Sequence, residues 1–162
     1  MRQSSWQRFR KLEQGLKKNL RISGEIEDLC VCPENRFKQI VCNNLNLSSG
    51  HYYEYLFSCI LFTVLGEQFQ KADIRSDITE HFDAKICGII CDFTMRSSQK
   101  RKQAREGITL IRFPHKNYHK GMRVKRDIVE IVLEAVRGNG IPIIPDDNLS
   151  SKLIGRVAKY AY

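Results

Sequence analysis

The chain has 162 residues, of which 42% are apolar and 28% are charged, and its formal net charge is +9. This composition excludes a disordered polymer, and a chain of this length buries about two-thirds of its unfolded surface, so neither disulfides nor a metal are required for stability. The longest apolar stretch, residues 52–65, contains Glu54 and is too short for a membrane span, so no membrane partner is expected. We expect one domain over residues 1–162, with a basic N-terminal helix over 1–24 and a core over 25–162.

Positive and negative residues are segregated along the sequence. Residues 2–21 contain seven Lys or Arg and one acid, residues 22–95 contain five basic and eleven acidic residues, and residues 96–126 contain eleven basic residues and one acid. Two basic regions that flank an acidic one suit a polyanionic partner such as nucleic acid. A basic face that is simply solvated is the alternative.

The first element expected along the chain is a helix over residues 5–20, capped by Ser4 or Ser5. Its apolar residues recur at helical spacing while the opposite face is basic; the apolar positions are Trp6, Phe9, Leu12, Leu16 and Leu20. A basic start with few acids also occurs in mitochondrial targeting segments, which is an alternative interpretation of this helix.

Two strands over residues 25–32 and 36–43, joined by a turn at 33–36, predict a β-hairpin. A helix over 51–70 follows, with the most regular apolar pattern of the chain. We expect this helix at the centre of the core because nearly all of its apolar residues share the i, i+3, i+4, i+7 positions.

From residue 85 onward, strand and helix patterns alternate. The continuous apolar run over 85–93 predicts a strand that is covered on both faces. The elements expected after it are a helix at 96–105, a strand at 108–113, a helix at 123–137, a strand at 141–144 and a last helix capped by Asn148. This alternation predicts an α/β fold with a mixed, mainly parallel sheet flanked by helices, preceded by the N-terminal helix and the β-hairpin.

The six cysteines lie in apolar segments and no secretory signal precedes them, which indicates reduced thiols in an intracellular protein, cytoplasmic or nuclear. Cys30, Cys32, Cys42 and His51 provide four residues of the types that bind zinc. Their spacing matches no common zinc motif, so buried structural thiols are the better interpretation.

Acidic residues around the apolar strand suggest a metal-dependent phosphodiesterase. Such a site needs acidic oxygens that converge on Mg²⁺ and a lysine that stabilises the phosphoryl charge. Asp92 ends the strand, Asp83 precedes it, Glu54 lies in the first turn of the central helix, and Lys100 follows. In this hypothesis Asp83 and Asp92 hold the metal and Lys100 stabilises the transition state. The alternative is that these acids are surface turn and cap residues.

Residues 51–137 resemble the restriction-endonuclease-like PD-(D/E)XK superfamily. In that family a helix with a glutamate precedes a sheet with acids on its second and third strands, and then a basic helix and a strand that ends in apolar-Arg-Phe. Glu54, Asp83, Asp92 and the segments 99–103 and 108–113 occupy these places here. The resemblance implies a nuclease with Mg²⁺ as cofactor. The family's acid-x-Lys is absent because Phe93 and Thr94 follow Asp92, so Lys100 has to enter the site from the next helix.

Residues 96–126 are also a candidate nucleic-acid interface without catalysis, as in a ribosome-associated RNA-binding protein. Cations neutralise phosphates and aromatic rings stack on unpaired bases. The residues assigned to this interface are Arg96, Lys100, Arg101, Lys102, Arg105, Lys116, Tyr118, Lys120, Arg123, Lys125 and Arg126. The sequence does not distinguish DNA from RNA, and such a binder requires no cofactor.

A protein-interaction module is the rival class. Residues 140–153, with Gly-Ile-Pro-Ile followed by a Leu-x-x-x-Leu helix, are similar in spacing to the cytoplasmic domain of FlhB-type secretion switch proteins. The self-cleaving Asn-Pro-Thr-His of that family is absent from this chain. The resemblance implies an assembly role with no enzymatic activity.

Overall fold

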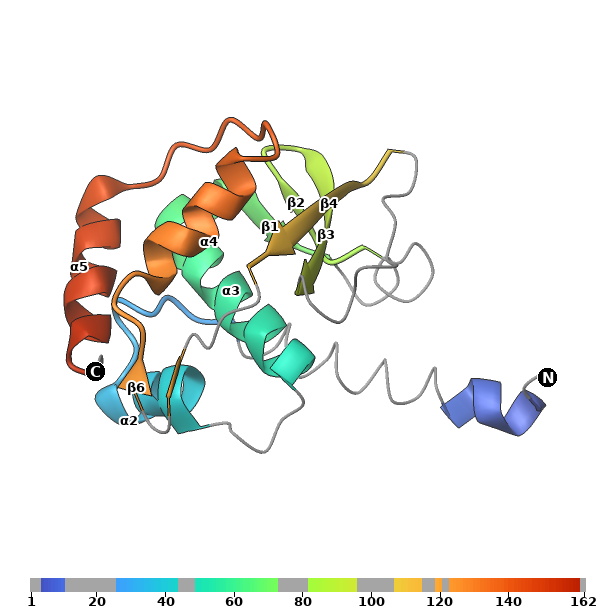
Figure 1. Cartoon of the computed structure of the whole chain (residues 1–162), viewed down its shortest axis with the longest axis horizontal. Helices are drawn as coiled ribbons and strands as arrows, with labels where there is room; N and C mark the ends of the chain where they lie inside the picture. Colours follow the sequence, from blue (N-terminus) through green and yellow to red (C-terminus); the bar gives the residue numbers. More distant parts are fainter. Residues whose placement is uncertain are drawn as a thin grey trace.

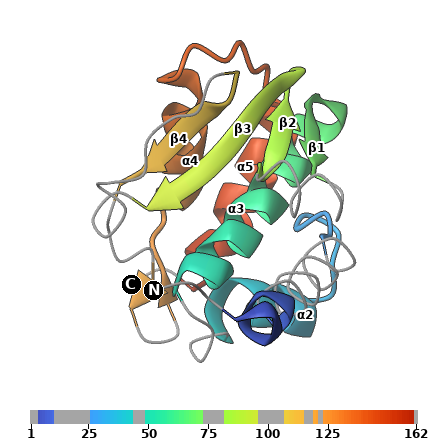
Figure 2. The ribbon, with the colours of Figure 1, turned by 90° about the vertical axis from the view of Figure 1, so that its right-hand side faces the viewer.

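The computed structural model describes residues 4–10, 26–43, 49–72, 82–95, 107–114, 119–120 and 123–160. A four-stranded sheet is covered on one side by helices α3 and α4, and α5 packs on these helices from the side away from the sheet (Figures 1 and 2). The elements are α2 (Glu34–Lys38), a π-helical turn η1 (Gln39–Asn43), α3 (Ser49–Leu65), a 3₁₀ turn η2 (Gly66–Gln68), β1 (Phe69–Lys71), β2 (Ala84–Ile86), β3 (Ile89–Met95), β4 (Thr109–Phe113), β5 (His119–Lys120), β6 (Arg123–Val124), α4 (Ile128–Arg137) and α5 (Asp147–Ala158).

The sheet has the order β1-β2-β3-β4, in which β3 and β4 are parallel and the other two pairs are antiparallel. The predicted α/β class is therefore confirmed, whereas the prediction of a mainly parallel sheet is only partly correct. The difference arises at Cys87 and Gly88, whose φ angles of 51° and 78° form a two-residue hairpin turn inside the apolar run. The strand expected over 85–93 is therefore two strands, β2 and β3.

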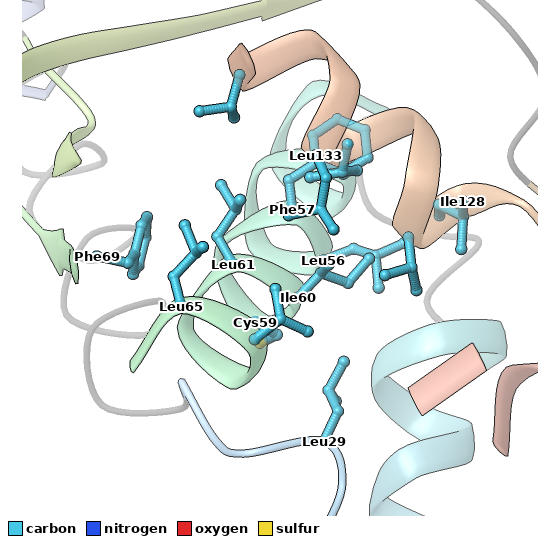
Figure 3. Close-up of a cluster of buried hydrophobic side chains, with 14 of the residues drawn as sticks. Leu29, Leu56, Phe57, Cys59, Ile60, Leu61, Leu65, Phe69, Ile128 and Leu133 are labelled. Atoms are coloured by element: carbon cyan, nitrogen blue, oxygen red, sulfur yellow. The ribbon is translucent and has the colours of Figure 1, made fainter. Parts of the chain in front are cut away.

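Helix α3 lies at the centre of the core, as its apolar pattern predicts. Its buried side chains meet the sheet, α4 and the segment around Leu29; Figure 3 shows this cluster, with Leu56, Phe57, Ile60, Leu61 and Leu65 labelled on the helix. Phe57 packs on Phe113 of β4 at a centroid distance of 4.2 Å. Burial of each such side chain contributes roughly 1.5–3 kcal/mol before entropy costs.

The helix predicted over 51–70 ends at Leu65. Gly66 has a φ of 56°, in the left-handed region that ends helices, and Phe69–Lys71 then forms edge strand β1. Lys71 therefore lies on an edge strand of the sheet and not on a helix.

The β-hairpin predicted over 25–43 is wrong. Residues 29–32 form a turn, and α2 and η1 follow it. Pro33 precedes the first helical residue, where its fixed φ and missing N–H suit a helix start. Phe37, Ile40 and Val41 are buried at helical spacing, which stabilises the helical alternative.

The C-terminal part keeps the expected helices but not the expected strand. Among the described residues, 141–144 pairs with no strand; Ile141 and Ile143 are buried, and the Gln68 side chain bonds both the N–H and the C=O of Ile144 at 2.8 Å. α4 begins at Ile128 rather than at residue 123, because Arg123–Val124 forms β6.

The cap of the last helix also differs from the prediction. The side chain of Asp146, not Asn148, accepts a 3.0 Å hydrogen bond from Leu149 N–H and caps α5. The backbone N–H of Asp146 donates to Val64 O at 2.9 Å, which fixes the start of α5 against the end of α3.

Arg156 of α5 holds this helix on the segment around α2. Its guanidinium donates to the backbone carbonyls of Leu29 and Cys32, pairs with Glu34 at 3.2 Å and lies 4.4 Å over the Phe37 ring. One side chain therefore satisfies two carbonyls that the turn leaves without helical or sheet partners.

Residues 5–10 are helical, as predicted for the start of the N-terminal helix, and residues 11–20 of that prediction lie outside the described residues. In Figure 1 this short helix stands apart from the sheet and the other helices. Within the described parts of the chain, no helix is both long and apolar enough to cross a membrane.

Candidate active site

Asp83 lies immediately before β2 and is fixed against β3 by two hydrogen bonds. Its backbone N–H donates to Cys91 O at 2.9 Å, and its carboxylate oxygen Oδ2 accepts from Phe93 N–H at 2.7 Å. These bonds bracket Asp92, so the Asp83 carboxyl group is held beside the Asp92 side chain. The sequence hypothesis placed both residues in one site, and the structure brings them together.

Asp92 lies on β3 between the core residues Cys91 and Phe93, so its side chain points to the sheet face opposite α3. Only 8% of Asp92 is exposed. Asp92 lies close enough to Asp83 to raise the pKa of the Asp83 carboxyl group, through its charge and through a side-chain hydrogen bond.

The pKa of the Asp83 carboxyl group lies well above its ordinary value of 3.8. Burial is the largest cause, followed by the negative charge of Glu54 and by the hydrogen bond and charge of Asp92, while the ammonium group of Lys71 acts in the opposite direction. Glu54 of α3 therefore belongs to the same electrostatic cluster as the two aspartates. Asp83 is therefore the member of the predicted set that is near both of the other acids, Glu54 and Asp92.

Lys71 of β1 is the residue of the cluster that the sequence hypothesis missed. Its ammonium nitrogen lies 3.5 Å from Oε1 of Glu54 and donates to the backbone oxygen of Asp83 at 2.9 Å. The side chains of Lys71 and Glu54 are only 8% and 10% exposed. A charge pair this deeply withdrawn from water has a high desolvation cost, which is typical of sites where charge performs a function.

The signal that would have identified Lys71 was the interruption at Gly66. A prediction that ended the helix at Gly66 would have left Phe69–Lys71 available as a strand. This strand pairs with β2, which begins next to Asp83, and so places Lys71 near the acids. Lys100, which was predicted for the lysine role, lies outside the described residues.

The donor set fits a hard divalent cation in part. Asp83 and Asp92 place two carboxyl groups side by side, and Mg²⁺ is commonly held by one or two carboxylates together with waters and substrate phosphates. Within the described parts of the chain, no group of three or more His, Cys, Asp or Glu side chains is placed so that it could hold a metal ion. Glu54 is engaged with Lys71, so Asp83 and Asp92 remain the two candidate ligands.

The neighbouring strand adds a cation to the sheet face that carries Asp92. Thr94 points to this face and is 6% exposed, in the position where the resembled family has its lysine. Arg112 of β4 is the register partner of Thr94 and is exposed to solvent. Because register partners in a sheet share a face, Arg112 lies on the Asp92 side of the sheet.

The structure describes only the end of the predicted nucleic-acid interface. The side chains of Lys125 and Arg126 are described, partly buried and exposed respectively, and Lys120 and Arg123 lie on the paired strands β5 and β6. The other assigned positions lie outside the described residues; these are Arg96, Lys100, Arg101, Lys102, Arg105, Lys116 and Tyr118.

Two of the four residues considered for zinc have described side chains. Cys30 and Cys32 lie in the turn before α2, with their sulfur atoms against the carbonyl oxygens of Leu149 and Leu29 at 3.4 and 3.7 Å. Burial raises the pKa of both thiols. They are free thiols in the structure, and the side chains of Cys42 and His51 lie outside the described residues.

No protein-family model, curated protein or solved structure matches the chain. A function is therefore inferred from the chemistry of the cluster formed by Glu54, Lys71, Asp83 and Asp92, which we term the acid–lysine site.

Proposed function

We propose that the chain is a metal-dependent phosphodiesterase that cleaves nucleic acid at the acid–lysine site. The observation that carries the proposal is the adjacent pair of carboxyl groups, Asp83 and Asp92, beside the buried Lys71–Glu54 ion pair. The order of elements also supports the resemblance to the PD-(D/E)XK superfamily, because Glu54 lies on a helix before the sheet and the aspartates lie at β2 and on β3.

Asp83 and Asp92 would hold Mg²⁺ or Mn²⁺. The bound cation would supply charge neutralisation at the phosphate and would lower the pKa of a bound water. Phe93 N–H fixes Oδ2 of Asp83 at 2.7 Å, so this carboxyl group needs little reorganisation to face a ligand. A bound cation would offset the electrostatic repulsion between these two neighbouring carboxylates.

Lys71 takes the role that the resemblance gives to the lysine of acid-x-Lys. Its ammonium group is held by Glu54 and by the Asp83 carbonyl oxygen, and its positive charge acts on the Asp83 carboxyl group. In a site of low dielectric constant, such a fixed charge stabilises a phosphoryl group more strongly than a solvated lysine does. Glu54 is a positioning residue in this proposal, since it acts by holding Lys71.

Nucleic acid is the proposed substrate because cations lie near the acids in the fold and in the sequence. Arg112 is exposed on the same sheet face as Asp92, and the most basic region of the chain, residues 96–126, begins directly after β3. Phosphate contacts from such cations supply most of the sequence-independent affinity for nucleic acid.

Metal binding tests the proposal before any substrate is known. Mn²⁺ titrated into the full chain and followed by electron paramagnetic resonance is expected to show binding that Asp83→Asn and Asp92→Asn each weaken by at least about tenfold. Glu67→Gln is the matched control, because Glu67 is an exposed acid on η2 outside the site. Equal Mn²⁺ binding by all four proteins would remove the two aspartates from the proposal.

A further inference from the structure

The N-terminal helix is stabilised by contacts within its own first turns. Ser4 Oγ accepts from Gln7 N–H at 3.2 Å, while the Gln7 side chain accepts from Ser4 N–H at 2.9 Å. This reciprocal pair is a capping box, which starts a helix without help from the rest of the fold. The helix over residues 5–10, which we call the arm, can therefore form without packing on the core.

Two aromatic rings lie side by side on this arm. Trp6 and Phe9 are stacked at a centroid distance of 6.1 Å and an interplanar angle of 20°, and the Arg10 guanidinium lies 5.4 Å from the centre of the Trp6 ring. Trp6 is 63% exposed and Phe9 is 58% exposed, although large aromatic residues are usually much more buried. The two rings are therefore not packed in the core, and their surface is accessible to a binding partner.

The charge around this aromatic pair indicates the chemistry of that partner. Arg8 and Arg10 are exposed on the same helix, and residues 2–21 carry seven basic residues against one acid. A partner that is both strongly anionic and able to stack on flat rings matches this surface. Unpaired nucleic acid has both properties, because its phosphates neutralise arginines and its bases stack on aromatic rings.

We infer that Trp6 and Phe9, with Arg8 and Arg10 beside them, form a binding site for single-stranded nucleic acid. The inference deepens the proposed function and rests on it, since the arm would deliver an unpaired strand to the acid–lysine site. Stacking on each base is sequence-tolerant, so the arm adds affinity without base specificity.

The inference is tested directly by fluorescence, because Trp6 is the chain's single tryptophan. A 20-nucleotide oligothymidylate, titrated into the full chain in EDTA to prevent metal-dependent cleavage, is expected to quench the tryptophan emission in a saturable, salt-sensitive way. An RNA strand of the same length should do so too, and a blunt duplex should do so less. Absence of quenching by either single strand would overturn the inference.

Two other occupants of the aromatic surface are outcomes of the same experiment. A blue shift that occurs only with vesicles of phosphatidylglycerol would assign the arm to a lipid surface. An emission change on dilution of the protein alone would assign it to a second copy of the chain. Either result, without quenching by the oligonucleotides, contradicts a nucleic-acid site.

Substitutions in the arm distinguish the contribution of aromatic stacking to binding from the contribution of positive charge. Binding of a labelled oligothymidylate, measured by fluorescence anisotropy, is expected to weaken about tenfold in Trp6→Ala/Phe9→Ala and to lose part of its salt dependence in Arg8→Gln/Arg10→Gln. Ile144→Ala is the control for the first variant, because Ile144 is 77% exposed on the body of the domain. Unchanged affinity in Trp6→Ala/Phe9→Ala would exclude the stacking surface.

The experiments distinguish an error in the inferred binding site on the arm from an error in the proposed phosphodiesterase activity. Cleavage that persists with an unchanged KM in Trp6→Ala/Phe9→Ala would exclude the arm and leave the acid–lysine site in place. Quenching by single strands in a chain that never cleaves nucleic acid would leave the arm in place and exclude the phosphodiesterase.

Discussion

Lys71 of β1 and Glu54 of α3 form a buried ion pair where the central helix meets the edge of the sheet. The ammonium nitrogen of Lys71, on β1, lies 3.5 Å from Oε1 of Glu54 on α3 and at the same time donates to the carbonyl oxygen of Asp83 at the start of β2. The central helix is thereby joined to the edge of the sheet at the point where the aspartates meet. This geometry makes the pair both a structural link and the cationic part of the proposed site.

Removing Lys71 is expected to reduce stability as well as activity. Lys71→Met leaves the buried Glu54 carboxylate without its partner, which should lower the free energy of unfolding by about 3 kcal/mol. Urea denaturation measures the loss, with Lys85→Met as the control, since Lys85 is exposed on the adjacent strand β2. Lys71→Met/Glu54→Gln should recover part of the stability but none of the activity. Equal stability of the Lys71→Met and Lys85→Met proteins would contradict the buried ion pair.

The Asp83 carboxyl group predicts a specific dependence of stability on pH. Its pKa is raised in the folded protein above the ordinary value of 3.8, chiefly by burial and then by the charge of Glu54. Between these two values the folded state holds a proton that the unfolded state has lost, so this group's stabilising contribution declines as pH rises through the interval. Asp83→Asn cannot titrate, and its stability relative to the natural protein should therefore rise with pH and then level off.

The measurement is chemical denaturation from about pH 4 to pH 8 in a chelator. Asp147→Asn is the control, because Asp147 is exposed in the first turn of α5. Parallel pH profiles for Asp83→Asn and the natural chain would show that the Asp83 carboxyl group titrates normally.

Arg156 should be one of the most important polar residues for stability. Arg156→Gln removes the donors to the carbonyls of Leu29 and Cys32 and the contact with the Phe37 ring. Leaving these carbonyls unsatisfied is expected to cost at least about 2 kcal/mol. Thermal unfolding of Arg156→Gln should show a markedly lower Tm than that of Arg137→Gln, which changes an exposed arginine of α4. A similar Tm for the two variants would contradict this assignment.

Cysteine labelling tests the packing of β3 and α3. Burial raises the pKa values of Cys59 and Cys91 to about 12, and both residues are fully buried. Because the thiolate is the reactive form, neither should react with iodoacetamide in the native protein at pH 8. Cys87, which is partly exposed in the hairpin turn, should be modified before Cys59 and Cys91. Tandem mass spectrometry distinguishes the sites, and rapid native-state modification of Cys91 would contradict the described packing.

Elements with a long, regular apolar pattern could be predicted from the sequence. The pattern of α3 identified the central helix, and the apolar run that ends near Asp92 identified the strand region of the site. The three acids were named together because Asp83 precedes the apolar run, Asp92 lies near its end and Glu54 lies near the start of the central helix. The spacing of these residues in the sequence could not predict the close approach of the two aspartates, because that approach depends on the register of β2 and β3.

Short elements were not predictable because their patterns fit several structures. Phe69–Lys71 has three residues, too few for a strand period to be distinguished from the end of a helix, and Lys71 was missed as a result. The apolar and polar residues of 36–43 are compatible with a β-strand as well as with a helix. The burial of Phe37, Ile40 and Val41, which are spaced as on one face of a helix, favours the helical structure. The hairpin was placed there instead of at Cys87 and Gly88, inside an apolar run without polar turn residues.

Cleavage of nucleic acid by the full chain and by Asp92→Asn tests the central claim most directly. Labelled single-stranded DNA, duplex DNA and RNA should each be incubated with Mg²⁺, with Mn²⁺ and with EDTA. We expect metal-dependent cleavage of at least one substrate by the natural chain and a reduction of at least about 100-fold in Asp92→Asn, while Glu67→Gln remains active. Equal cleavage by Asp92→Asn and the natural chain, or no cleavage of any substrate with either metal, would contradict a phosphodiesterase at this site.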